Sequence, residues 1–135
     1  PDEWSDLKGL YSYKGRVPEA TKADFQTYKK IKATGIYGTV RVPAAKIDTS
    51  TLTLDVAHIN ERRHGVTQEE AVSYIKNAAF SLKRRHWTGE TFLNYYSEEG
   101  ASYVRTSDNV IRTSFKKDEF DKKTKSAMEV LKNGK

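Results

Sequence analysis

Apolar residues recur at helical spacing in two stretches on either side of the middle of the chain. The first covers residues 21–33, or 18–33, and Gly35 follows where a helix of that length should end. In the second, residues 120–131, the remaining positions are mostly lysines and acids. Both stretches predict amphipathic helices with one face turned toward a core.

A third helix is predicted to begin at Thr67, because Thr67-Gln-Glu-Glu70 has the spacing of a capping box. In such a box each of the two side chains accepts a hydrogen bond from the backbone N–H of the other residue. Apolar residues continue at helical spacing to Leu82, and the basic residues 83–85 follow where the helix dipole favours cations. The pattern predicts one continuous helix over residues 67–85.

Alternation of apolar and polar residues predicts short strands elsewhere. Residues 38–42 alternate and stop at Pro43, and a second short strand covers either 45–48 or 51–54. Residues 91–97, 101–106 and 110–115 also alternate, and they are separated by Glu-Glu-Gly and Ser-Asp-Asn, which are turn sequences. These last three segments predict an antiparallel meander.

If both turns of this meander are two-residue hairpins, at 99–100 and 108–109, its side chains fall on two faces. One face is mainly apolar: Leu93, Tyr95, Val104, Ile111, Thr113 and Phe115. The other is polar and carries tyrosines beside arginines: Asn94, Tyr96, Tyr103, Arg105, Arg112 and Ser114. Such a face suits single-stranded RNA, because bases stack on rings while arginine holds phosphate. A change of one residue in either turn would alter this assignment.

The length and composition indicate a folded domain with a basic surface. We expect a single domain over residues 1–135, in which residues 1–17 form an aromatic-bearing lead-in segment. The chain begins at Pro1, which we interpret as the start of a fragment of a longer protein. The absence of cysteine excludes disulfides and a cysteine nucleophile, and no apolar run is long enough to span a membrane. The net charge of +6 favours a polyanion or an acidic protein as partner.

The candidate catalytic residues are His58 and His64, which are separated by five residues that include Arg62 and Arg63. Imidazole titrates near neutrality, so two histidines can supply one proton acceptor and one proton donor to a single reaction. The arginines favour an anionic substrate, and cleavage of a phosphodiester needs a cation to neutralise the developing charge. The pair also precedes the N-terminus of a predicted helix, which favours anions. The segment has the groups of a metal-free nuclease site.

Simpler interpretations exist for the same residues. Two histidines in a basic domain are more often a core or capping residue and a surface one. The run Lys83-Arg-Arg-His86 is most simply a solvated helix end, with contact to a nucleic-acid backbone as the alternative. A zinc site is disfavoured, because the spacing is not H-E-x-x-H and a third ligand would have to come from His86 or a distant acid. We expect no metal and no other cofactor.

Three motifs follow one another along the chain: His58-Ile-x-x-Arg-Arg-His64-Gly, then Thr-x-x-Glu and a helix, then Val110-Ile-Arg-Thr-Ser-Phe115 and a lysine-rich helix. In this order they resemble the barnase–EndoU–colicin E5/D–RelE superfamily of nucleases. The resemblance covers roughly residues 36–132. It is greatest to phage-associated members and to toxin domains at the C-termini of bacterial polymorphic and contact-dependent inhibition proteins. It implies a microbial-RNase-like α+β fold, with helices packed on a small antiparallel β-sheet, and metal-independent cleavage of RNA, often tRNA.

The resemblance also implies roles for particular residues. His58 and His64 become the acid and base, Arg63 with Arg62 behind it stabilises charge, and the hydroxyl of the last core strand falls on Thr113. Alternation places Ser114 rather than Thr113 on the polar face, so both are candidates. The expected contacts to RNA come from the polar face: Tyr96, Tyr103, Arg105 and Arg112.

These expectations describe a toxin-type RNA endonuclease. It would be delivered as the C-terminal part of a larger secreted protein, act in the cytoplasm of a target cell and be neutralised by an acidic immunity protein. A basic toxin and an acidic inhibitor would associate quickly through electrostatic steering. The alternative is a non-catalytic nucleic-acid-binding or phage-structural module that uses the same basic face, and a metal-dependent DNase is a third class.

Overall fold

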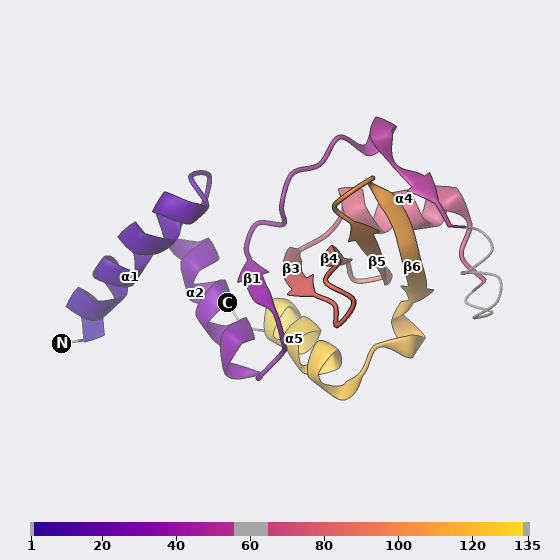
Figure 1. Ribbon diagram of the computed structural model, residues 1–135. Coiled ribbons are helices and arrows are strands. Elements are labelled where there is room, and N and C mark those ends of the chain that lie inside the picture. The colour runs from indigo at the N-terminus through magenta and orange to yellow at the C-terminus, as the bar shows by residue number, and fades with distance from the viewer. Residues whose placement is uncertain (1, 56–64, 134–135) are drawn as a thin grey trace.

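The computed structural model describes residues 2–55 and 65–133, and it has the predicted α+β fold, with helices packed on a mostly antiparallel sheet (Figure 1). The sheet has six strands in the order β1-β3-β4-β5-β6-β2. They are β1 (Thr39–Arg41), β2 (Thr53–Leu54), β3 (Phe80–Arg85), β4 (Thr91–Tyr96), β5 (Gly100–Arg105) and β6 (Val110–Lys116). Every neighbouring pair is antiparallel except β2 and β6, which are parallel.

The described α-helices are α1 (Asp2–Arg16), α2 (Lys22–Ala33), α4 (Gln68–Lys76) and α5 (Lys122–Asn133). Both α2 and α4 begin with a capping box, formed by Thr21 with Asp24 and by Thr67 with Glu70, so the predicted start at Thr67 is confirmed. Helix α5 begins after Asp121, whose carboxylate accepts the backbone N–H of Thr124 at 2.7 Å. Within the described residues, no helix has both the length and the apolar character needed to cross a bilayer.

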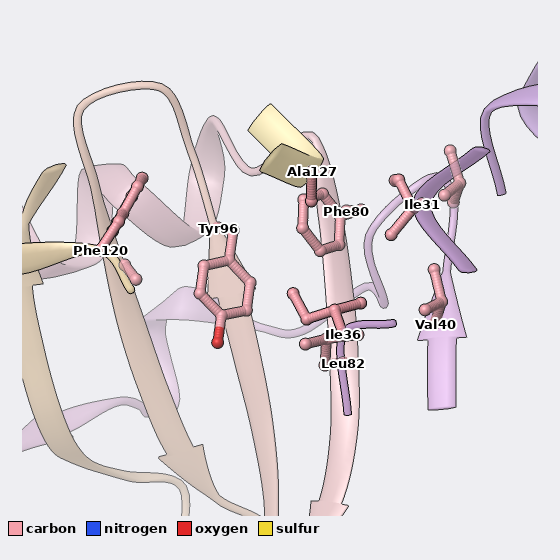
Figure 2. Packing of buried hydrophobic residues seen from close by; sticks show 10 residues of the cluster. Ile31, Ile36, Val40, Phe80, Leu82, Tyr96, Phe120 and Ala127 are labelled. Atoms are coloured by element: carbon pink, nitrogen blue, oxygen red, sulfur yellow. The ribbon is translucent and has the colours of Figure 1, made fainter. Parts of the chain in front are cut away.

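The helices cover opposite faces of the sheet. On the face that we call the α4 face, Ala71 and Ile75 of α4 pack against Tyr95, Val104 and Ile111 of the strands. On the other, the α5 face, the strands pack against α2 and α5 (Figure 2). The buried residues of this second cluster include Ile31, Val40, Phe80, Leu82, Tyr96 and Ala127. Each amphipathic helix therefore buries its apolar side on one face of a two-sided sheet.

The predicted helix over residues 67–85 is wrong in its second half, because α4 ends at Lys76 and residues 80–85 form β3. Phe80 and Leu82 satisfy strand alternation as well as helical spacing, so the apolar pattern alone could not separate the two. In the fold, β3 lies between β1 and β4 and pairs with both. Hydrogen bonds on two sides and burial of both apolar side chains favour the strand.

The two turns of the meander also differ from the predicted ones. Between β4 and β5, the turn residues are 98–99, because the backbone N–H of Ser97 donates to Gly100 at 2.9 Å. Between β5 and β6, Arg105 pairs with Val110, so the loop spans residues 106–109 and Asn109 has a φ of 58°. These shifts alone keep the side chains on their predicted faces, since each moves the pairing by an even number of residues.

A bulge between β5 and β6 does change the faces. Val104 pairs with Ile111, but Tyr103 pairs with Thr113, which leaves Arg112 as an extra residue on β6. Beyond the bulge, Thr113 lies on the face of Tyr103, and Ser114 lies on the face of Val104 and Ile111. Phe115 pairs with Ala101 and packs on the α5 face. The hairpin prediction therefore assigned Thr113, Ser114 and Phe115 to the wrong faces.

The lead-in segment forms helix α1 and adds a third, smaller cluster at the β1 end of the sheet (Figure 1). Leu10 and Val17 pack there with Phe25 of α2. Tyr13 is 1% exposed, and its hydroxyl donates to the carbonyl oxygen of Val42 at 2.8 Å. The N-terminal residues are thus joined to the domain by both apolar and hydrogen-bonded contacts.

We expect Gly100→Ala to destabilise the fold, because an added Cβ would lie 2.5 Å from the ring of Tyr74 and 2.6 Å from the carbonyl oxygen of Phe115. Overpacking of this kind costs about 1–3 kcal/mol of unfolding free energy. Thermal and urea unfolding measure the loss. The control is Gly15→Ala in α1, where nothing lies within 4 Å. Equal stability of the two variants would contradict the contact between α4 and β5.

Candidate functional site

The four residues of the predicted acid-base segment, His58, Arg62, Arg63 and His64, lie outside the described residues. The last described residue before them is Asp55, at the end of β2. Its carboxylate accepts a hydrogen bond from Nη1 of Arg112 at 2.9 Å. This ion pair connects the chain leading into the histidine-bearing segment to β6, the strand that carries the predicted site residues Arg112, Thr113 and Ser114.

The structure separates the two candidate hydroxyls of β6. Ser114 is 0% exposed, and its hydroxyl donates to the carbonyl oxygen of Ala101 and lies 3.0 Å from the Ser102 hydroxyl. The Ser102 hydroxyl in turn donates to Ala71 of α4 at 2.7 Å. Ser114 therefore belongs to the interior, and the expectation that it faces an open surface is wrong. Thr113 lies on the opposite face beside Tyr103.

The two predicted base-stacking tyrosines also have different surroundings. Tyr96 is 1% exposed, and its ring lies between those of Phe80 and Phe120, at centroid distances of 5.2 Å and 6.1 Å (Figure 2). Tyr96 is thus a core residue and not a surface for RNA, contrary to the prediction. Tyr103 is partly buried, and its hydroxyl lies 2.9 Å from that of Tyr96. Burial raises the pKa of Tyr103, and Tyr96 raises it further, so its phenol stays protonated.

The two predicted phosphate-binding arginines differ in how far acids engage them. Arg105 donates from Nε and Nη2 to Asp108, at 3.0 Å and 2.9 Å, and from Nη1 to Glu90 at 3.2 Å. Its hydrogen bonds to Asp108 raise its pKa, and three of its donor nitrogens are engaged by carboxylates. Arg105 therefore links the turn that carries Glu90 to the loop that carries Asp108. Among the described residues Arg112 pairs with one acid, Asp55, and 38% of its side chain is exposed.

The remaining predicted residues meet in a hollow of about 750 Å³ on the α5 face, beyond the part that packs against α5. Tyr103, Arg112 and Thr113 line one side of it. The buried Asn94 is also in its lining, and its Oδ1 has no hydrogen-bond partner among the described residues. We call this the aromatic hollow, and its other main lining residues are Tyr37, Arg84, His86, Trp87 and Phe92.

Sequence reasoning missed the contribution of the turn between β3 and β4. Trp87 is 89% exposed at this turn, and its ring lies 5.3 Å from that of His86. His86 in turn lies edge-on to Phe92, at a centroid distance of 6.0 Å. The signal was present in the sequence as His86-Trp-Thr-Gly, which is turn chemistry between two alternating segments. This turn signal was overlooked because Lys83-Arg-Arg was assigned to the end of a helix.

His86 is the histidine that the structure places at the hollow. Its Nδ1 lies 3.0 Å from the hydroxyl of Thr88, which donates to Glu90 at 3.0 Å. Glu90 also accepts from Arg105, so a chain of polar groups fixes the ring from one side. Among the described residues, Nε2 of His86 has no hydrogen-bond partner, and this nitrogen is available to a ligand.

Arg84 is the cation that the structure fixes most firmly beside the hollow. Its Nε donates to the carbonyl oxygen of Tyr37 at 2.6 Å, and its guanidinium lies 5.7 Å from the centre of the Tyr37 ring. Its stem crosses Gly38, where an added Cβ would lie 2.9 Å from Cγ of Arg84. These contacts use one nitrogen, and within the described residues they leave Nη1 and Nη2 for a ligand, in the planar arrangement that suits phosphate.

The hollow thus brings together exposed aromatic rings, an imidazole, hydroxyl groups, the carboxylate of Glu90 and three guanidinium groups, those of Arg84, Arg85 and Arg112. Rings can stack with bases, and guanidinium groups can hold phosphate oxygens. In the described part of the chain, no three His, Cys, Asp or Glu side chains are grouped so that they could hold a metal ion. Side chains of these types are the ones that contact bases and phosphates in nucleic-acid-binding proteins.

The assignment of Thr113 and Ser114 to opposite faces can be tested because the chain has no cysteine. We expect the Thr113→Cys variant to react with a thiol reagent in the native state at least ~10 times faster than the Ser114→Cys variant, since thiol reactivity depends on access. The rates are measured by mass spectrometry. Reaction in denaturant should be equally fast for both variants and serves as the control. Faster native labelling of the Ser114→Cys variant would contradict the bulge.

No protein-family model, curated protein or solved structure matches this chain. The resemblance to the nuclease superfamily therefore rests on the short motifs of the sequence.

Proposed function

We propose that this protein binds single-stranded RNA in the aromatic hollow and cleaves it without a metal ion, as a toxin-type endoribonuclease. The observation that carries the proposal is the meeting of Tyr103, Arg112 and Thr113 with Arg84 and the His86–Trp87 turn in that hollow. Residues that line this hollow were predicted both from the polar face of the meander and from the resemblance. RNA, and tRNA among RNAs, is the proposed substrate.

Single-stranded RNA suits the hollow better than duplex. Trp87 is almost fully exposed and can stack on a base that is not already paired. Phe92 and Tyr37 extend the apolar lining, while Arg84 and Arg112 supply positive charge at its edges. A duplex shields its bases from such rings, so its binding would use the arginines alone.

The proposed reaction is attack by a 2′-hydroxyl on the neighbouring phosphorus. The 2′-oxygen–phosphorus bond forms and the bond to the 5′-oxygen breaks, which leaves a 2′,3′-cyclic phosphate and a 5′-hydroxyl. A base takes the proton of the 2′-hydroxyl, and an acid gives a proton to the leaving 5′-oxygen. His58, His64 and His86 are the candidates for these two roles. Charge on the phosphate would be neutralised by Arg112 or Arg84, together with Arg63 and Arg62. Thr113 would donate a hydrogen bond to a phosphate oxygen.

The proposal includes the expected biological setting. The RNase would be the C-terminal part of a larger secreted protein, act in the cytoplasm of a target cell and be neutralised by an acidic immunity protein. The net charge of +6 supports such a partner, because opposite charges accelerate association. An acidic inhibitor that covered the aromatic hollow would place its carboxylates against Arg84 and Arg112.

A specific observation favours the second candidate, a module that binds RNA without cleaving it. Within the described residues, His86 is the one histidine at the hollow, while the reaction needs both an acid and a base. If the hollow worked alone, it would bind RNA and leave it intact. The cleavage experiment separates the two candidates.

We expect the purified protein to cleave total tRNA or a single-stranded oligonucleotide in EDTA and to leave cyclic phosphate ends. Two of the three variants His58→Ala, His64→Ala and His86→Ala should each lose ~10²–10⁴-fold in rate, because one histidine is the acid and another the base. Gel analysis and mapping of the cut ends measure this, and melting temperatures should stay unchanged. RNA that is bound but left intact would support the binding module. Cleavage abolished by EDTA, or wild-type rates in all three variants, would falsify the proposal.

Trp87→Ala should weaken the binding of a fluorescently labelled single-stranded RNA by about 1–3 kcal/mol, since one base loses its stacking partner. Fluorescence anisotropy measures the affinity. Tyr11→Ala in α1 is the matched control, because Tyr11 is also exposed, at 71%, but lies far from the hollow in the sequence and on another element. An equal loss in the two variants would mean that Trp87 does not stack with a base.

A further inference from the structure

A second hollow, of about 880 Å³, adjoins the aromatic hollow, and the two share Tyr37, Arg84 and Arg85. Its lining comes from the last turn of α2, the connection from α2 to β1, strand β3 and the first turn of α5. We call it the lysine hollow, and its charged lining residues are Lys32, Lys83, Arg84, Arg85 and Lys123. Five cations and no acid thus surround one surface depression.

Three of these cations have no acidic partner in the part of the chain that the structure describes. Within the described residues, no carboxylate lies within 4.0 Å of the charged nitrogens of Lys32, Arg84 or Lys123. Asp121 interacts electrostatically with Arg84 and Lys123, but its carboxylate caps α5. The main cause of its lowered pKa is the hydrogen bond from the backbone N–H of Thr124. The positive charge of the hollow is therefore available to an anion.

Tertiary packing gathers three of the cations from distant parts of the sequence. Arg84 lies on the α5 face, because it alternates with Leu82 and Phe80, while Lys83 and Arg85 begin on the other side of the strand. Lys123 lies against the connection after α2, since a Cβ on Gly35 would be 4.0 Å from its Nζ. Lys32, Arg84 and Lys123 thus come from α2, β3 and α5, which meet at the same end of the sheet.

The lining of this hollow suits a backbone better than a base. Tyr37 is the one aromatic ring among its lining residues, and the guanidinium of Arg84 already lies over that ring. Lysine ammonium groups bind phosphate as point charges and do not read base edges. A ligand that filled both hollows would place bases against Trp87 and Phe92 and phosphates against Lys32 and Lys123.

Building on the proposed function, we infer that the lysine hollow is a second subsite, which holds the phosphate backbone of the same single-stranded RNA beyond the segment bound in the aromatic hollow. Arg84 joins the two subsites. The substrate is then a polymer that extends across Tyr37 and Gly38, and a mononucleotide or dinucleotide would fill the aromatic hollow alone. Affinity should rise with RNA length until both hollows are occupied.

The experiment compares binding of oligouridylates of about four and about twelve nucleotides, within the range of single-strand site sizes. The variant is Lys32→Ala with Lys123→Ala. The control is Lys14→Ala with Lys76→Ala, which removes two exposed lysines from the last turns of α1 and α4. Anisotropy titrations over a range of salt concentrations give the slope of log affinity against log salt, and cleavage of the same oligonucleotides is measured in parallel.

For the longer RNA, we expect the slope to fall by about 1.4 in the Lys32 and Lys123 variant, because each phosphate contact on a single strand contributes about 0.7. The shorter RNA should bind that variant and the wild type alike, and the control variant should match the wild type for both. An unchanged slope for the longer RNA would overturn the second subsite and leave the proposed nuclease untouched. If the wild type neither binds nor cleaves either RNA, the proposed function fails first, and the subsite fails with it.

Discussion

The bulge opposite Tyr103 and Val104 decides which side chains of the last strand can meet a ligand. Arg112 is an extra residue on β6, so the strand changes face between Ile111 and Thr113. As a result Ile111 and Ser114 are both buried on the α4 face, and Arg112 and Thr113 both line the aromatic hollow. The hydrogen bonds of Ser114 to Ser102 and Ala101 are consistent with this register, because a serine hydroxyl buried at this depth requires a partner.

The α5 face of the sheet is covered along one part of its strands and open along another. Toward the ends nearest α5, its side chains form a core, in which Tyr96 packs between Phe80 and Phe120. Toward the other ends, the same face is open and forms the aromatic hollow. The hydrogen bond between the hydroxyls of Tyr96 and Tyr103 lies at the boundary. A residue's position on the polar or apolar side of a strand therefore did not determine its accessibility, which also depends on the part of the face that α2, Phe120 and α5 cover.

The distribution of ion pairs concentrates the positive charge more than the net charge of +6 suggests. Arg105 is engaged by Asp108 and Glu90, and Arg41 by Glu19. In contrast, Lys32, Arg84 and Lys123 have no acidic partner among the described residues and lie around adjoining hollows. Exposed ion pairs add little stability, but they do remove cations from the field that a polyanion meets. The cations without an acidic partner among the described residues are therefore concentrated around the two hollows.

Local signals in the sequence determined the helix start at Thr67, the three meander strands and the α+β class, because a capping box and alternation act between neighbouring residues. The sequence left the start of α2 open between residues 18 and 21, and the structure shows the capping box at Thr21. Alternation also selected Tyr103 and Arg112, and the resemblance selected Thr113; all three line one hollow. Tyr96 and Ser114, in contrast, are interior, and Arg105 links two turns. The end of α4, the strand at residues 80–85 and the bulge in β6 depended on partners far away in the chain. The same holds for the meeting of Lys32, Arg84 and Lys123. Pairing on both edges of β3 and burial against two helix layers are long-range contacts, and only the tertiary structure could choose among patterns that the local sequence left equal.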